Sequence, residues 1–199
     1  GQSKLMWVDR SGTRTPVDSS WTFTLQYALA NNGWSLSPDG SRVAIGLATS
    51  SGEDVWIREL ASGRMSRLTF DTAGEFRPRW APDGESVTYI SAADFSLRQR
   101  RANGAGGEEV LSRGSRILES VWAPDRSSIV LRVGGEAGPG ARDIVLVRPG
   151  EDGAARPLAA DPGFDEAAPA LSPDGKWLAY QSDETGRPEI FIPPFPNTD

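Results

Sequence analysis

Short runs of apolar residues alternate along the chain with polar segments rich in glycine, proline, aspartate and serine. The clearest runs occupy residues 42–45, 86–90, 128–131 and 176–180, and none reaches the length of a helix. β-Branched and aromatic residues are frequent in these runs, and turn-forming residues bound them, a pattern typical of strands. The pattern therefore predicts an all-β protein.

The strongest signal is an internal repeat directly before each of these runs. Its four copies read Leu-Ser-Pro-Asp-Gly, Trp-Ala-Pro-Asp-Gly, Trp-Ala-Pro-Asp-Arg and Leu-Ser-Pro-Asp-Gly. The residues of the repeated turns are Pro38, Asp39, Gly40, Pro82, Asp83, Gly84, Pro124, Asp125, Pro173, Asp174 and Gly175. The copies recur at about 40 to 50 residues, the period of a four-stranded propeller blade. The repeat therefore predicts a β-propeller.

Each residue of the repeated turn has a structural reason. Proline presets φ at the first turn position, aspartate accepts hydrogen bonds from backbone amides, and glycine adopts positive φ before the next strand. We therefore interpret the four aspartates as turn formers and not as catalytic groups. Arg126 replaces the glycine in the third copy, and we expect it to adopt the left-handed conformation at a cost of about 1 kcal/mol.

The repeat also sets the expected organisation of the chain. Third strands are predicted at 54–57, 96–101, 143–147 and 189–192, and fourth strands at 66–70 and 156–159. We expect one partial propeller over residues 1–199, built from four-stranded antiparallel blades. The expected units are the end of a blade at 4–17, blades at 34–70, 77–112 and 118–160, and a blade without its fourth strand at 168–196.

At about 45 residues per blade, the chain accounts for four to five blades, and we expect an incomplete arc. Such an arc leaves sheet edges and an apolar blade face exposed, which would promote self-association. The alternative is that the terminal strands pack together into a small closed ring.

These motifs resemble a known family. The Ser/Ala-Pro-Asp-Gly turn, the strand after it and the ending Leu68-Thr69-Phe70 resemble the PD40 (WD40-like, TolB-like) β-propeller repeat. The last unit, residues 171–196, is similar to propellers fused to bacterial membrane-anchored serine/threonine kinases, although Pro193 stands where a basic residue is expected. The resemblance implies a non-catalytic binding platform for a protein or small ligand. It further implies the extracytoplasmic (periplasmic or cell-surface) sensor region of a receptor-type kinase.

Composition excludes several classes of chemistry. The chain has 21 basic and 27 acidic residues, which disfavours binding to nucleic acid. It contains no cysteine and no histidine, which rules out thiolate catalysis, Ser-His-Asp triads and His- or Cys-ligated metals. Its longest uncharged stretch, residues 19–38, is too polar to cross a bilayer, and no targeting segment is recognisable. We expect no enzymatic activity, no cofactor, no metal and no membrane contact by this segment.

The fold predicts where a ligand would bind. In a propeller the loops from the fourth to the first strand and from the second to the third strand gather on one face, where binding tends to occur. The residues expected on that face are Phe70, Asp71, Phe76, Arg77, Arg79, Phe164, Asp165, Glu166, Asp183 and Glu184. Aromatics among arginines resemble the composition of interface hot spots. The competing interpretation is that Phe76 and Phe164 cap the core between blades.

Other interpretations stay open at this point. Prolyl-oligopeptidase-type peptidases carry a similar propeller, and although this chain lacks their Gly-x-Ser-x-Gly motif and histidine, it could be the accessory propeller of such an enzyme. The oxygen-bearing residues Asp161, Asp165 and Glu166 could hold calcium. The basic run 98–101 could contact an anion. Carbohydrate could bind to exposed tryptophans among Trp7, Trp21, Trp34, Trp56, Trp80, Trp122 and Trp177.

Overall fold

The computed structural model of the chain describes residues 2–24, 33–49, 52–135, 140–151 and 155–196. Within these ranges every regular element is a strand, which confirms the all-β prediction. None of the described residues forms a helix of the length and apolarity needed to cross a bilayer.

The strands form five antiparallel sheets, each built from strands that are consecutive in the sequence. A two-stranded sheet contains β1 (Met6–Val8) and β2 (Arg14–Pro16). The first four-stranded sheet contains β3 (Trp34–Leu36), β4 (Arg42–Thr49), β5 (Gly52–Glu59) and β6 (Met65–Arg67). The second contains β7 (Glu75–Trp80), β8 (Ser86–Ser91), β9 (Leu97–Arg101) and β10 (Glu109–Ser112).

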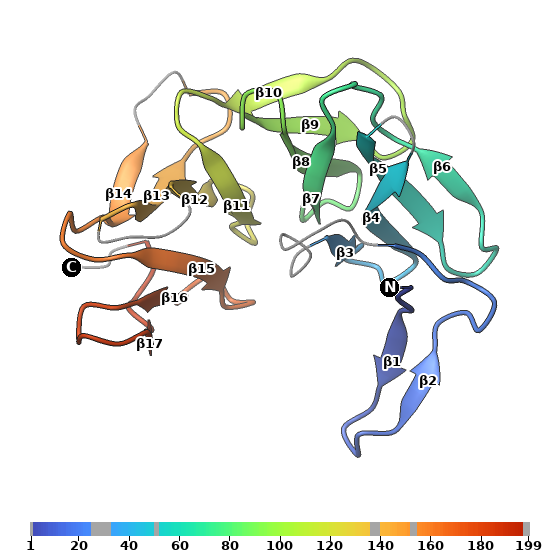
Figure 1. Cartoon of the computed structure of the whole chain (residues 1–199), viewed down its shortest axis with the longest axis horizontal. Coiled ribbons are helices and arrows are strands. Elements are labelled where there is room, and N and C mark those ends of the chain that lie inside the picture. Colours follow the sequence, from blue (N-terminus) through green and yellow to red (C-terminus); the bar gives the residue numbers. More distant parts are fainter. Residues whose placement is uncertain (1, 25–32, 50–51, 136–139, 152–154, 197–199) are drawn as a thin grey trace.

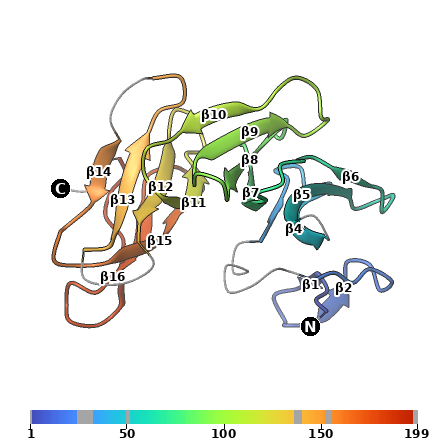
Figure 2. The same ribbon diagram turned by 45° about the horizontal axis from the view of Figure 1, so that its top comes forward.

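The third four-stranded sheet contains β11 (Ile117–Trp122), β12 (Ile129–Gly134), β13 (Arg142–Val147) and β14 (Arg156–Ala159). A three-stranded sheet of β15 (Glu166–Leu171), β16 (Leu178–Ser182) and β17 (Glu189–Phe191) follows it. Figure 1 shows the sheets following one another around an open arc, with β3, β7, β11 and β15 on its inner side. The turned view in Figure 2 keeps the sheet of β1 and β2 well apart from the sheet of β15 to β17. The expected arc of propeller blades is confirmed, and the closed ring is not formed.

The four repeated turns have the same local geometry. In each turn the fifth residue donates its backbone N–H to the carbonyl of the second, over 2.8 Å in the first copy and 2.9 Å in the other three. Each aspartate accepts a backbone N–H two residues later, as from Ser41 to Asp39 at 3.1 Å and from Glu85 to Asp83 at 2.8 Å. The φ of Gly40 is 70° and that of Arg126 is 65°, so the arginine adopts the left-handed conformation that its position requires.

Apolar packing joins each blade to the next. One cluster of buried side chains, including Val55, Trp80 and Tyr89, lies between β3–β6 and β7–β10. Others lie between β7–β10 and β11–β14 and between β11–β14 and β15–β17, and a further one joins the N-terminal segment to β4. Because both faces of an inner blade are apolar, a blade cannot bury its core alone, and its stability depends on its neighbours.

The repeated turns also meet between neighbouring blades. A Cβ placed on Gly84 would lie 3.6 Å from Cδ of Pro38, and one on Gly175 would lie 3.4 Å from Cδ of Pro124. Arg126 occupies the equivalent position between these two contacts, and its guanidinium forms an ion pair of 2.9 Å with Asp83 of the preceding turn. The strained conformation of Arg126 is therefore accompanied by a contact that a glycine could not make.

Exposed apolar side chains gather at the two ends of the arc. Trp7 and Val8 of β1 are exposed at one end, and Ile190 of the edge strand β17 is 64% exposed at the other, next to exposed Ile192. The unpaired backbone of an edge strand with apolar side chains is a template for pairing with another chain.

We therefore expect concentration-dependent self-association of this chain. Light scattering coupled to size exclusion should give an average mass that rises with protein concentration. Ile190→Lys, which places a charge on the edge strand, should shift the mass toward that of one chain. A wild-type mass equal to one chain at every concentration would contradict the expectation.

Candidate functional site

The loops predicted to form a binding face do occupy one end of the blades. They connect β6 to β7, β14 to β15 and β16 to β17, and antiparallel pairing within each blade brings these connections to the same end of the sheets. Phe70 and Asp71 lie in the first loop, Phe164 in the second, and Asp183 and Glu184 in the third.

Four of the ten residues predicted for this face are buried and are not available to a docking partner. Phe76 is 5% exposed and belongs to the core between β7–β10 and β11–β14, where its ring meets Phe95 edge-on at 6.3 Å. Arg77, Asp165 and Glu166 are buried as well. For Phe76 the core interpretation holds. The prediction that Phe76 lies on the binding face is wrong, because β7 directs its side chain between two sheets.

Bulges in the inner strands determine which side chains point to the axis of the arc. The pairing register shifts between Phe76 and Arg79 in β7 and between Ala167 and Ala170 in β15. Within these bulges Arg77 has a φ of 53° and Ala168 a φ of 54°. An extra residue in a strand re-aims its neighbours, and in β7 it sends the guanidinium of Arg77 toward the adjacent blade.

The side chain of Glu119 links three blades near the axis. Its Oε1 lies 3.5 Å from Nη1 of Arg77 in β7 and 3.8 Å from Nε of Arg132 in β12, and both arginines are buried. Its Oε2 accepts the backbone N–H of Ala168 in β15 at 3.0 Å. Burial lowers the pKa of Arg77 and Arg132, and the nearby carboxylate of Glu119 opposes that shift. The arrangement serves to neutralise buried charge and to hold the blades in place.

Asp165 has a similar structural role between the last two blades. It accepts hydrogen bonds from Nη2 of Arg142 at 3.0 Å and from the backbone N–H of Ala141 at 3.1 Å. Its own backbone N–H donates to Asp183 at 2.8 Å. Two residues expected to contact a ligand therefore hold the loops to each other.

Buried glutamates begin two of the inner strands, and the sequence analysis singled out only one of them, Glu166. Glu75 begins β7 as Glu166 begins β15, each three residues before a proline and eight before the turn aspartate, so the internal repeat could have revealed Glu75. Burial, reinforced by Asp71 and Asp54, raises the pKa of Glu75. Burial, reinforced by Asp143 and other nearby carboxylates, raises the pKa of Glu166 to about 7.

Phe70 is the most prominent feature of the exposed part of the face. Its ring is 61% exposed, and the guanidinium of Arg67 lies over it at 4.9 Å. Arg67 itself is fixed by Asp54 at 2.8 Å and by the carbonyl of Thr69 at 2.9 Å. Asp71 follows in the sequence and lies 3.9 Å from Arg98. An aromatic ring is thus presented to solvent on a rigid support.

The described residues contain no group of three or more acidic, histidine or cysteine side chains placed to hold a metal ion. In the loop considered for calcium, Asp161 accepts the backbone N–H of Gly163 and Asp165 is paired with Arg142. The basic run of β9 has internal partners too, since Arg98 contacts Glu108 at 2.7 Å and Asp94 at 3.2 Å.

The tryptophans do not form one sugar-binding platform. Trp80 is buried in the core. Trp7 and Trp34 are exposed and line a small apolar pocket at the N-terminal end of the arc, whereas exposed Trp177 precedes β16 at the other end.

The raised pKa of Glu166 gives a testable prediction. Because its folded-state pKa of about 7 exceeds the ordinary value of 4.5, the folded state binds the proton more tightly, and stability falls as the pH rises from about 4.5 through 7. Glu166→Gln should therefore raise the free energy of unfolding by about 1 to 3 kcal/mol at pH 8 and change it little at pH 4. Urea unfolding at the two pH values measures both.

Exposed Glu184, in the neighbouring loop, supplies the control, because Glu184→Gln should have no such effect. Burial also raises the pKa of Glu53 to about 7. Glu53 therefore lowers the free energy of unfolding with rising pH in every variant, and its contribution cancels when the variants are compared. Equal effects of Glu166→Gln at pH 4 and pH 8 would contradict the assignment.

Comparison with known proteins supports the fold. No protein-family model matches the chain. The sequence is 23% identical over 206 residues to the uncharacterized peptidase YuxL of Bacillus subtilis, covering 78% of this chain and 31% of that protein. It is 28% identical over 163 residues to a TolB homolog of Chlorobium luteolum, covering 77% and 34%. The chain thus spans about a third of the length of the curated relatives it matches.

Solved structures give the same result. TolB from Acinetobacter baumannii superposes with a TM-score of 0.73 at 20% identity, covering 96% of this chain and 44% of that one. A putative TolB from Agrobacterium tumefaciens gives 0.74 at 20% identity, covering 96% and 70%. A prolyl endopeptidase gives 0.64 at 17% identity, covering 98% and 31%. The chain therefore has a TolB-like β-propeller fold.

Proposed function

We propose that this chain is a non-catalytic binding platform that recognises a protein through the loop face carrying Phe70. The observation that carries the proposal is the exposed Phe70 ring, held by Arg67 on a loop between two blades. Interfaces draw most of their affinity from a few rigid aromatic and arginine anchors. The contact of Phe70 with Arg67 restrains the ring, which lowers the side-chain entropy that binding would cost.

The charges of this face are consistent with binding in place of catalysis. Arg77, Glu119 and Asp165 are occupied by contacts between blades. Lacking histidine and cysteine, the chain has neither an imidazole base nor a thiolate to serve in nucleophilic catalysis. Asp71, the accessible acidic neighbour of Phe70 in the sequence, can form part of a polar rim around an apolar contact.

The finer part of the proposal is that the chain belongs to the extracytoplasmic sensor region of a bacterial receptor-type kinase. This rests on the sequence of the last unit, residues 171–196, and its similarity to propellers fused to such kinases. In that setting, a ligand on the loop face would change the relative stability of states that the receptor can adopt.

A second candidate is the accessory propeller of a prolyl-oligopeptidase-like serine peptidase. It is favoured by the similarity to YuxL and to a prolyl endopeptidase. The reading frame of the parent gene separates the two. A kinase domain and a membrane span upstream support the sensor, whereas a Gly-x-Ser-x-Gly hydrolase domain downstream supports the peptidase.

The binding role of Phe70 can be tested by substitution. Wild type, Phe70→Ala and Trp177→Ala are immobilised side by side, and the proteins captured from a bacterial extracytoplasmic fraction are compared by quantitative mass spectrometry. Trp177 is the control because it is an exposed aromatic residue on a different part of the arc and outside the edge strand β17. At least one captured protein should fall about tenfold or more with Phe70→Ala alone. An unchanged set of captured proteins for Phe70→Ala would contradict the proposal.

A further inference from the structure

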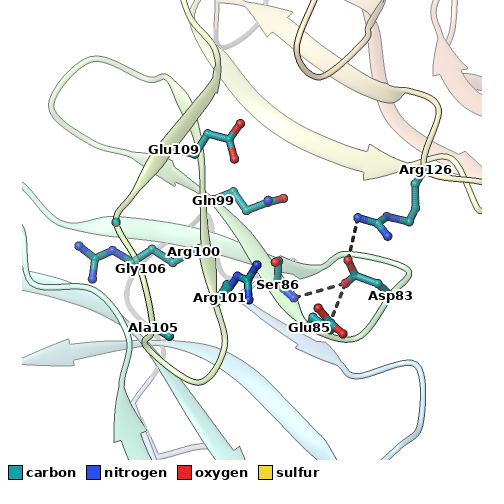
Figure 3. Close-up of a pocket in the computed structure, with 11 residues that line it drawn as sticks. Asp83, Glu85, Ser86, Gln99, Arg100, Arg101, Ala105, Gly106, Glu109 and Arg126 are labelled. Carbon is teal, nitrogen blue, oxygen red and sulfur yellow. Dashed lines mark hydrogen bonds and ion pairs between the residues drawn. The ribbon is translucent and has the colours of Figure 1, made fainter.

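A pocket of about 310 Å³, whose lining residues are drawn in Figure 3, lies at the end of the blades opposite to the loop face. Its walls come from the Asp83 turn between β7 and β8, from β9, from the glycine-rich loop between β9 and β10, and from Arg126 of the next blade. Turns between first and second strands share this end with loops between third and fourth strands, because neighbouring strands are antiparallel. The pocket is therefore separate from the surface around Phe70.

One wall of the pocket is an interblade ion pair that includes a strained residue. Arg126 has a φ of 65°, where the equivalent turns have glycine. Its guanidinium reaches Asp83 at 2.9 Å, and Asp83 in turn accepts the backbone N–H of Glu85 at 2.8 Å (Figure 3). The turn itself requires this φ, and the arginine side chain adds a contact that the glycines of the equivalent turns cannot make. Here that side chain closes the pocket on the side of the neighbouring blade.

The remaining charges of the pocket are unpaired. Within the described part of the chain, no hydrogen bond or ion pair engages the side chains of Arg101, Glu85 or Glu109. Oε1 of Gln99, also at the wall, is buried and has no hydrogen-bond partner among the same residues. Arg100 points to the preceding blade, where its Nη1 lies 3.5 Å from the carbonyl of Leu68.

The glycine-rich loop leaves its backbone open to this space. A Cβ built on Gly104, Gly106 or Gly107 would meet no atom within 4 Å. Gly104 and Gly106 have positive φ, so the loop conformation itself requires glycine at these two positions. The loop therefore borders the pocket without filling it with side chains.

We propose that this pocket binds a small zwitterion, a molecule of amino-acid or dipeptide size that carries both a carboxylate and an ammonium group. The guanidinium of Arg101 would bind the carboxylate, and Glu109 would bind the ammonium group (Figure 3). Charge-assisted hydrogen bonds of both signs are available in the pocket. The volume lies at the lower end of the range of small-molecule sites.

The balance of charges favours a zwitterion over other small ligands. A simple anion would approach Glu85 and Glu109 as well as Arg101, and a simple cation would approach Arg101 as well as the glutamates. A neutral sugar can hydrogen-bond to these groups but neutralises none of their charges. A ligand with both signs of charge can pair Arg101 and Glu109 at the same time. This site goes beyond the proposed function and does not depend on it.

The test is an NMR titration of the ¹⁵N-labelled chain with glycylglycine, with N-acetylglycine and ethylammonium as probes that carry only one of the two charges. Saturable shifts should appear in residues 83–86, 99–109 and 126 with glycylglycine. Arg101→Gln and Glu109→Gln should each weaken the binding about tenfold or more. Arg113→Gln, a matched loss of one exposed arginine outside the pocket, should leave it unchanged.

Three results would overturn the proposal. They are the absence of saturable shifts up to about 10 mM glycylglycine, equally tight binding of N-acetylglycine or ethylammonium, and equal weakening by Arg113→Gln. Because the spectrum of each variant also reports whether it is folded, a loss of binding through unfolding is recognised directly. The titration detects binding in the pocket and not at the Phe70 surface, so its outcome is independent of the capture experiment.

Discussion

The contacts of Glu119 join three consecutive blades near the axis of the arc. This carboxylate faces Arg77 of one blade and Arg132 of its own, and it accepts a backbone hydrogen bond from Ala168 of the next. The two arginines are buried, and a buried cation without a nearby carboxylate is strongly destabilising. A blade that rotated or slid relative to its neighbour would separate these charges. We infer that the ion cluster favours one arrangement of these three blades, in addition to the apolar packing between them.

Apolar packing between the blades supplies most of the stability of the fold. Each buried cluster lies between two blades, so no blade is independent, and the repeated turns add contacts from one blade to the next. As a consequence, the buried residues of the loops have a structural role, and the exposed residues remain available for binding. Residues at the axis, such as Asp165, hold the loops together, while residues at the rim, such as Phe70, stay exposed and are carried on a rigid base. Rigid presentation of a few exposed groups is what a binding surface requires.

The sequence was sufficient for the fold because its turns are encoded locally. The Pro-Asp-Gly corners occur once per blade, and the strands on either side of them have the lengths and residue types that pairing requires. Even the exception at Arg126 has the φ that its neighbours in the repeat predict. The candidate site was harder to predict. The bulges at Arg77 and Ala168 shift which side chains reach the axis, and nothing in a simple alternation of polar and apolar residues reports a bulge. Phe76 was placed on the surface because it was assigned to the loop before the blade, whereas it is the second residue of β7 and pairs in register with Ile90. Glu119 was not singled out, because its partners come from three separate stretches of the sequence.

The central claim is that Glu119, Arg77 and Arg132 at the axis hold the blades together and do not bind a ligand. Its most direct test is hydrogen exchange, together with urea unfolding, of the Glu119→Gln variant. The amide preserves the size of the side chain but cannot neutralise two buried arginines. We expect a loss of about 2 to 3 kcal/mol in the free energy of unfolding, with faster exchange in β7 and β15 as well as in β11. Unchanged stability, or faster exchange confined to β11, would contradict the claim.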